Sequence, residues 1–281
     1  MDWQGRRESD NVDDRRGFSA GHLAGGGGII GVIFLLARFL LGGGNTDDLQ
    51  QSFPQEPQQE MTNEQKAADD DRAKFVKVVL ADTEDVWDKI FSDMGRQYTK
   101  PTLVLFRDAT TSGCGNASSA TGPFYCPQDH DVYIDLAFAD ELKNKFGASG
   151  DFAMAYVVAH EVGHHIQYLF GVSDKMARLQ QRLSETEYNT YSVKLELQAD
   201  FYAGVWAHYD QQMKNVIHPA DIKEALDAAS AIGDDRLQQE TQGRVTPDAF
   251  THGTSAQRMY WFKKGYDTGD IKQGDTFAGE M

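Results

Sequence analysis

The chain has 281 residues, and its 27 Lys and Arg against 43 Asp and Glu give a formal net charge of −16. This length suffices for one large domain or two small ones with a buried core. The acidic balance disfavours a nucleic-acid partner, because binding phosphates requires clustered cations. The mean hydropathy is −0.53, so most of the sequence is typical of a water-soluble protein.

One apolar segment departs from this composition. Residues 23–41 are apolar apart from their glycines and Arg38, and their length is close to the roughly 20 residues that span a bilayer. The run Gly25 to Gly28 disfavours a buried core helix, and no small-x-small cleavage site follows as in a signal peptide. We therefore expect a single transmembrane helix. Four arginines precede this segment: Arg6, Arg7, Arg15 and Arg16. They predict that residues 1–22 form a cytoplasmic tail and that the chain after the segment is extracytoplasmic.

The remaining sequence divides into a linker and a folded domain. Residues 42–71 are rich in Gly, Gln, Pro and Asp, which predicts a flexible linker. From residue 72 to 281 apolar residues recur with helical or strand periodicity, so we expect a helix-rich α+β domain with a small sheet. The predicted helices cover 73–91, as one helix or as two short ones broken near Asp82, and 151–170, 173–183, 190–209, 219–239 and 255–262, and a further helix opens at 139–142. The predicted strands cover 102–106 and 132–136.

The two cysteines and the second strand each leave two interpretations open. Cys114 and Cys126 form a disulfide if the domain lies outside the cytoplasm, and are otherwise free thiols. Two cysteines are too few for a cysteine-type zinc site. In the strand over 132–136, Tyr133 and Asp135 point to one face. That strand is either internal to the sheet or an edge strand that pairs with an extended substrate.

The helix over 151–170 contains the sequence His-Glu-Val-Gly-His. His160 and His164 are four residues apart, so both rings lie on one helix face and can bind one zinc ion. Glu161 lies about 100° round the helix from His160, where it can act as general base on a zinc-bound water. Gly163 lowers helix propensity, which indicates that another part of the chain approaches it closely.

A third zinc ligand is available in the helix over 190–209. Glu196 with the two histidines would complete the two-His, one-Glu set of catalytic zinc sites, which leaves a fourth position for water. Asp200 lies four residues further on the same face and can accept a hydrogen bond from a ligating histidine. The small residues Ala199, Ala203 and Gly204 would let the two helices pack closely. The alternative interpretation is a solvated acidic face.

This His-Glu-x-x-His sequence followed by Glu-x-x-x-Asp resembles the gluzincin pattern of zincin peptidases. Other stretches resemble the bacterial putative neutral zinc metallopeptidase family, namely MDWQGRRESDNVDDRRG, the Gly-rich apolar segment, SGCG, GPFYCPQDHDVYIDL, AHEVGHHIQ, ELQADFYAGVW, AIGDDRL and THGTSAQRMYWFKKGY. The resemblance covers nearly the whole chain. It implies a single-span protein with a zincin-like domain, with zinc ligands His160, His164 and Glu196 and with Glu161 as base.

Gluzincins often bring a second hydrogen-bond donor to the reacting carbonyl from C-terminal sequence. His252 is the candidate for this oxyanion-stabilising role, and a plain loop histidine is the alternative. Arg258 is a further candidate, with a structural role as its alternative. His165 lies off the metal-facing stripe and is interpreted as polar packing or surface. Asp234 and Asp235 lack calcium-loop spacing, so a helix-end salt bridge is expected there.

These residues predict a membrane-anchored zinc metallopeptidase that hydrolyses peptide bonds in a protein or peptide substrate. A zinc hydrolase that acts on something other than protein, for example a cell-wall peptide, is a further possibility. The alternative is a non-catalytic membrane adapter in which zinc holds two helices together. Structural zinc sites normally have four protein ligands, so His252 as a fourth ligand would favour the adapter. The sequence leaves the substrate and the oligomeric state open.

Overall fold

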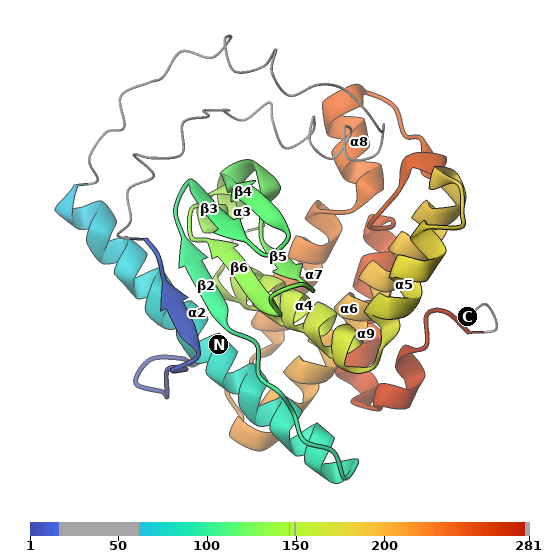
Figure 1. Ribbon diagram of the computed structural model, residues 1–281. Helices are drawn as coiled ribbons and strands as arrows, with labels where there is room; N and C mark the ends of the chain where they lie inside the picture. The colour runs from blue at the N-terminus through green and yellow to red at the C-terminus, as the bar shows by residue number, and fades with distance from the viewer. Residues whose placement is uncertain (17–61, 146, 149, 279–281) are drawn as a thin grey trace.

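The computed structural model describes residues 1–16, 62–145, 147–148 and 150–278, which form a helix-rich α+β fold with small sheets (Figure 1). The expected fold class is confirmed in this respect. None of the described helices combines the length and apolarity that a bilayer crossing requires. The expected transmembrane segment, residues 23–41, lies outside the described residues. The helices are α2 Asn63–Asp93, α3 Phe138–Asn144, α4 Asp151–Leu169, α5 Val172–Gln180, α6 Glu185–Lys214, α7 Pro219–Ala231, α8 Asp234–Gln242 and α9 Ser255–Thr268.

The main sheet has the strand order β1-β2-β6-β5, from β1 Val12–Asp14, β2 Leu103–Phe106, β6 Asp131–Asp135 and β5 Phe124–Cys126. β1 and β6 both run parallel to β2, whereas β5 runs antiparallel to β6. A separate hairpin pairs β3 Ala109–Ser112 with β4 Gly115–Ser118. Leu103, Leu105, Val132 and Ile134 belong to the main core with α2 and α4. Tyr133 joins a smaller cluster with Val104 and Phe106, as the strand alternation predicts.

The position of β6 decides between the two interpretations of the second predicted strand. β6 lies between β2 and β5, so it is internal, and β5 is the edge strand beside it. The sequence did not predict β5, because three residues between prolines are too few to show an alternating pattern. Cys126 of β5 forms a disulfide with Cys114, which confirms the disulfide interpretation and ties β5 to the β3–β4 hairpin.

Glycines set the spacing between α4, α6 and α9. A Cβ atom at Gly163 of α4 would lie 2.9 Å from the carbonyl oxygen of Ala199 in α6, which is the close approach that the sequence indicated. Gly204 instead faces α9, where a Cβ would lie 2.0 Å from the carbonyl oxygen of Phe262. Gly265 of α9 makes the reciprocal approach to α6. α6 therefore contacts both α4 and α9 backbone to backbone.

Three stretches differ from their expected structure. Residues 63–71, expected in the linker, begin α2, because Thr62 and Gln65 form a capping box that starts the helix there. The predicted helix over 219–239 is two helices, and it breaks at Gly233, where a Cβ would lie 2.4 Å from the backbone nitrogen of Ser255. Residues 1–16, expected to be a tail without a core, pack on the domain through β1.

Candidate metal centre

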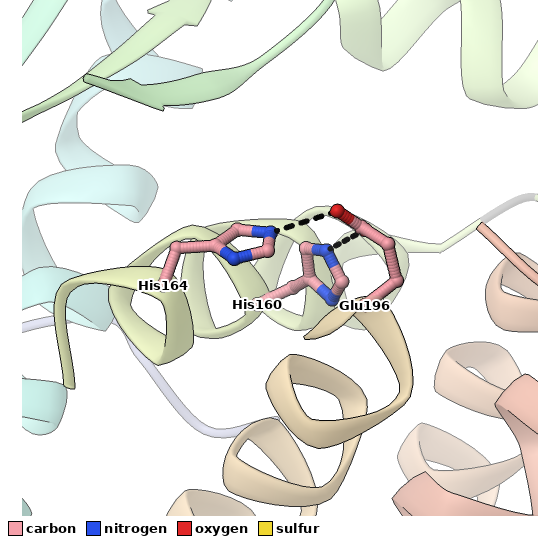
Figure 2. Close-up of side chains that lie close together, drawn as sticks. All are labelled: His160, His164 and Glu196. Carbon is pink, nitrogen blue, oxygen red and sulfur yellow. Dashed lines mark hydrogen bonds and ion pairs between the residues drawn. The ribbon is translucent and has the colours of Figure 1, made fainter. Parts of the chain in front are cut away.

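Three side chains from two helices converge in a single cluster. His160 and His164 come from successive turns of α4, and Glu196 comes from α6 (Figure 2). Their candidate ligand atoms all lie within 4.8 Å of one another, and among the described residues no other group of three is so arranged. Nε2 of His160 lies 3.1 Å from Oε2 of Glu196, and Nε2 of His164 lies 3.4 Å from Oε1. The sequence-predicted ligands are thus brought together.

These distances fit a zinc ion. Ligand atoms about 2.0–2.1 Å from a tetrahedral zinc lie about 3.3 Å from one another. Each histidine Nε2 lies near that distance from one of the two Glu196 oxygens, at 3.1 and 3.4 Å, and one ligand atom from each residue lies within 4.8 Å of the others. Two imidazoles and one carboxylate are also a common ligand set of catalytic zinc. The residues present therefore fit the metal that the sequence predicts.

Asp200 holds His160 in the orientation that a ligand needs. Its Oδ1 lies 2.9 Å from Nδ1 of His160, so Nδ1–H donates to the carboxylate and Nε2 points to Glu196. Arg258 of α9 binds Asp200 with two nitrogens, Nε at 2.8 Å and Nη2 at 3.0 Å. The Tyr156 hydroxyl also donates to Asp200. Gly204 and Gly265 make this network possible, because they bring α9 close enough to α6 for Arg258 to reach Asp200.

The charges in and around the cluster of His160, His164 and Glu196 favour the binding of a cation or of protons there. Burial opposes charge on His160, but Asp200 and Glu196 raise its pKa to about 10. Burial also opposes ionisation of Glu196, but His164 and His160 hold its pKa well below the ordinary value. Burial acts in the same way on Asp200, and Arg258 and His160 lower its pKa to about 2. A divalent cation would replace the protons that the imidazoles otherwise hold.

Comparison with known proteins bears directly on this cluster. Residues 1–277 match the family described as putative neutral zinc metallopeptidase. The chain belongs to this family. It is 52% identical over 285 residues to the uncharacterized protein YpfJ of Escherichia coli strain K12, covering 99% of each chain. It is 44% identical over 218 residues to the uncharacterized protein Mb2605 of Mycobacterium bovis, covering 74% of this chain and 73% of that one. No solved structure matches. The resemblance found in the sequence is confirmed.

In this member of the zinc metallopeptidase family, the cluster opens into a cavity of about 560 Å³. The catalytic candidate Glu161 lines the cavity beside the two histidines, and burial raises the pKa of its carboxyl. One wall is formed by Phe124 and Tyr125 of β5, and another by apolar residues of α5 and α6, including Met176 and Leu195. The volume is in the range of sites that bind small molecules or short peptide segments.

His252 lines the same cavity but lies outside the three-residue cluster. Its Nδ1 lies 3.2 Å from Oδ1 of Asp234, and its backbone N–H donates to Oδ2 of the same carboxylate at 2.6 Å. The backbone N–H groups of Thr251 and Gly253 also donate to Asp234. Burial opposes charge on His252, but Asp234 and Glu196 raise its pKa. Asp234, at the start of α8, therefore forms the expected helix-end ion pair, with His252 as its partner. It also binds the backbone of the His252 loop, which the sequence did not indicate.

His165 belongs to the wall of the site and not to the cluster. Its ring is buried, with Nε2 2.6 Å from the carbonyl oxygen of Thr99 and Nδ1 3.1 Å from the hydroxyl of Tyr125. Of the two interpretations of this histidine, polar packing is the one that the structure shows. The contact fixes Tyr125, and hence β5, beside the helix that carries the two candidate histidine ligands.

Proposed function

We propose that the protein is a zinc-dependent peptidase that hydrolyses peptide bonds, with His160, His164 and Glu196 as zinc ligands. The observation that carries the proposal is the convergence of these three ligands in an open cavity while Glu161, beside them, is left free of the cluster. When bound, zinc supplies Lewis acidity, which lowers the pKa of a coordinated water and polarises a carbonyl group.

Glu161 and His252 would carry the proton transfer and the charge stabilisation. The Glu161 carboxylate accepts a proton from the attacking water and delivers it to the leaving amine, and burial, which raises its pKa, favours uptake of that proton. His252, held by Asp234, donates to the oxygen that becomes negative in the transition state. Asp200 keeps the imidazole of His160 in place and touches no reacting atom.

The edge strand β5 would position the substrate. β5 pairs with β6 on one side, and no other described strand pairs with its second side. An extended peptide can add to such an edge by main-chain hydrogen bonds. Phe124 and Tyr125 of β5 line the cavity, so a peptide bound along this strand would pass over the metal ligands.

The membrane anchor at residues 23–41 stays a prediction from the sequence, because it lies outside the described residues. The disulfide between Cys114 and Cys126 supports an extracytoplasmic place for the domain, since such bonds persist in oxidising compartments.

The alternative function, a non-catalytic adapter with a structural zinc, requires a fourth protein ligand. His252 was the candidate for it. In the structure His252 is paired with Asp234 and is absent from the cluster of possible ligands among the described residues. A site with three protein ligands is typical of catalytic zinc.

The experiment that tests the proposal compares the full chain with its Glu161→Gln variant. We expect about one zinc per chain in both proteins and hydrolysis of a generic protein substrate such as casein only in the parent. Glu185→Gln is the matched control, because Glu185 is an exposed residue at the start of α6. Activity retained in Glu161→Gln would remove Glu161 as the base. A folded parent protein that binds no zinc would overturn the proposal. Zinc binding without hydrolysis in both the parent and the control variant would favour the adapter.

A further inference from the structure

We infer that residues 1–16 and residues 62–278 lie on the same side of any membrane that the protein contacts. The chain between them then makes no net crossing of a bilayer. This inference concerns topology, and it does not rest on the proposed peptidase activity. It replaces the arrangement that the sequence suggests, with a cytoplasmic N-terminal tail and an extracytoplasmic domain.

Backbone hydrogen bonds make the N-terminal segment part of the main sheet. β1 pairs in parallel with β2, with Val12 opposite Leu103 and Asp14 opposite Leu105. The pairing extends beyond β1 at both ends, because Leu103 donates to the carbonyl of Asn11 and Arg15 donates to the carbonyl of Leu105. β1 lies beside α2 and β2 (Figure 1). A bilayer core about 30 Å thick cannot separate two strands that are hydrogen-bonded in this way.

A buried carboxylate of the domain takes its hydrogen-bond donors from the N-terminal segment, and its other cation, Lys100, lies 4.0 Å away. Glu84 of α2 is 1% exposed. Ser9 donates to it through Oγ at 2.5 Å, Asn11 through Nδ2 at 2.7 Å and Arg7 through Nη1 at 3.0 Å. Ser9 is itself buried, and its backbone N–H donates to the carbonyl of Lys77. Without this segment Glu84 would lose three donors, which is unfavourable for a buried charge.

The four N-terminal arginines are also bound by carboxylates. Arg6 pairs with Asp82 at 2.6 Å, and Arg7 pairs with Glu84 and Asp85 on the same helix. Arg16 pairs with Asp69 at 2.9 Å, and Arg15 pairs with Asp13 of β1 itself. The sequence suggested that these cations mark a cytoplasmic tail. In the fold, three of these four arginines bind the N-terminal segment to α2. Their positive charge is therefore explained by this docking and does not indicate the orientation of the chain in a membrane.

Arg16, which precedes residues 17–61, lies close to the start of α2, the helix that follows them. Arg16 contacts Asp69 and Asp70, which lie in the second turn of α2, shortly after the helix begins at Asn63. A chain that crossed a bilayer through residues 23–41 would need a second crossing to return. Residues 42–61 contain Asp47, Asp48 and several glutamines, so they are too polar to supply this second crossing. Contact of residues 23–41 with lipid would therefore begin and end on one side.

Cysteine accessibility in the full chain tests the inference. Glu8 and Gln239 are exposed residues of the N-terminal segment and of α8, and each is changed singly to cysteine. The native cysteines are joined in a disulfide, and the parent chain gives the background. A membrane-impermeant maleimide is added to intact cells, to spheroplasts and to lysed cells. We expect Glu8→Cys and Gln239→Cys to be labelled under the same conditions. Labelling of the two positions on opposite sides of the membrane would overturn the inference.

A second measurement tests whether the segment is docked in the full chain. Arg6→Glu places a like charge beside the buried Asp82, so we expect its Tm to fall by roughly 5 °C or more relative to the parent. Glu8→Lys, at an exposed neighbouring position, is the control and should leave the Tm within about 1 °C. Equal Tm values for Arg6→Glu and the parent would show that the segment is not docked, and would also overturn the inference.

Discussion

Asp210 of α6 is predicted to destabilise the protein at neutral pH, although it is a native residue. Its side chain is fully buried, and neither carboxylate oxygen has a hydrogen-bond partner among the described residues. Lys214 lies 3.4 Å away and Arg6 lies 4.0 Å away, but both cations make shorter contacts with Asp82. Burial and the neighbouring charge of Asp82 together raise the pKa of Asp210 to about 6.

The sign and size of the effect follow from this pKa. Between the ordinary pKa of 3.8 and about 6, the folded protein keeps a proton that the unfolded chain has released, so stability falls as pH rises through this window. Above it the loss is complete. A shift of about two units corresponds to about 3 kcal/mol. Asp210→Asn is neutral at every pH and should therefore recover about 2 to 3 kcal/mol at pH 8, but little at pH 4.

Urea unfolding of the full chain at pH 4, 6 and 8 measures this difference. The quantity of interest is the free energy of unfolding of Asp210→Asn minus that of the parent, which should increase with pH and level off above about pH 6. Asp174→Asn is the control, because Asp174 is exposed on α5. A difference that stays constant from pH 4 to pH 8 would refute the reasoning, since it would mean that Asp210 titrates alike in both states.

Three further predictions concern the helices and the site. Gly204→Ala should lower the free energy of unfolding by about 1 to 3 kcal/mol, because the alanine Cβ would lie 2.0 Å from the Phe262 carbonyl oxygen. This clash outweighs the helix preference of alanine, and a variant that is more stable in thermal unfolding would contradict the prediction. Asp200→Asn should weaken zinc binding about 10- to 100-fold in chelator competition, because it alters the hydrogen-bond acceptor of His160 and leaves Arg258 without its carboxylate partner. Unchanged zinc affinity would show that Asp200 does not orient His160. Cys114→Ser should lower the free energy of unfolding by about 3 kcal/mol, and a reductant should lower it equally in the parent but not in the variant.

The cluster of candidate metal ligands could be predicted from sequence because its geometry is largely local. A spacing of four residues places His160 and His164 on one helix face whatever the rest of the fold does. The same spacing relates Glu196 to Asp200, and the structure brings both pairs to one point. Gly163 gave the further signal that two helices touch there, which the distance to Ala199 confirms.

The parts that sequence did not reveal depend on contacts between distant residues. Asp234 binds the backbone of the His252 loop across 18 positions, and nothing in a pair of adjacent aspartates indicates such a contact. β1 is three residues long with two aspartates, so it has no strand pattern, and its pairing becomes visible only when β2 lies beside it. The break at Gly233 likewise results from the passing backbone of Ser255 and not from local propensity.

The sequence contains two conflicting indications of the compartment in which the domain lies. The docked N-terminal segment favours one of them. The arginines before the apolar segment predict a cytoplasmic N-terminus, whereas the cysteine pair predicts an oxidising compartment for the domain. Both can hold only if the chain crosses a membrane between them, and the pairing of β1 with β2 places them together. Arg6, Arg7 and Arg16 are bound to carboxylates of α2 in the fold, which gives them a structural reason to be present. The disulfide between Cys114 and Cys126 is then the stronger signal, and it applies to residues 1–16 as well as to the domain.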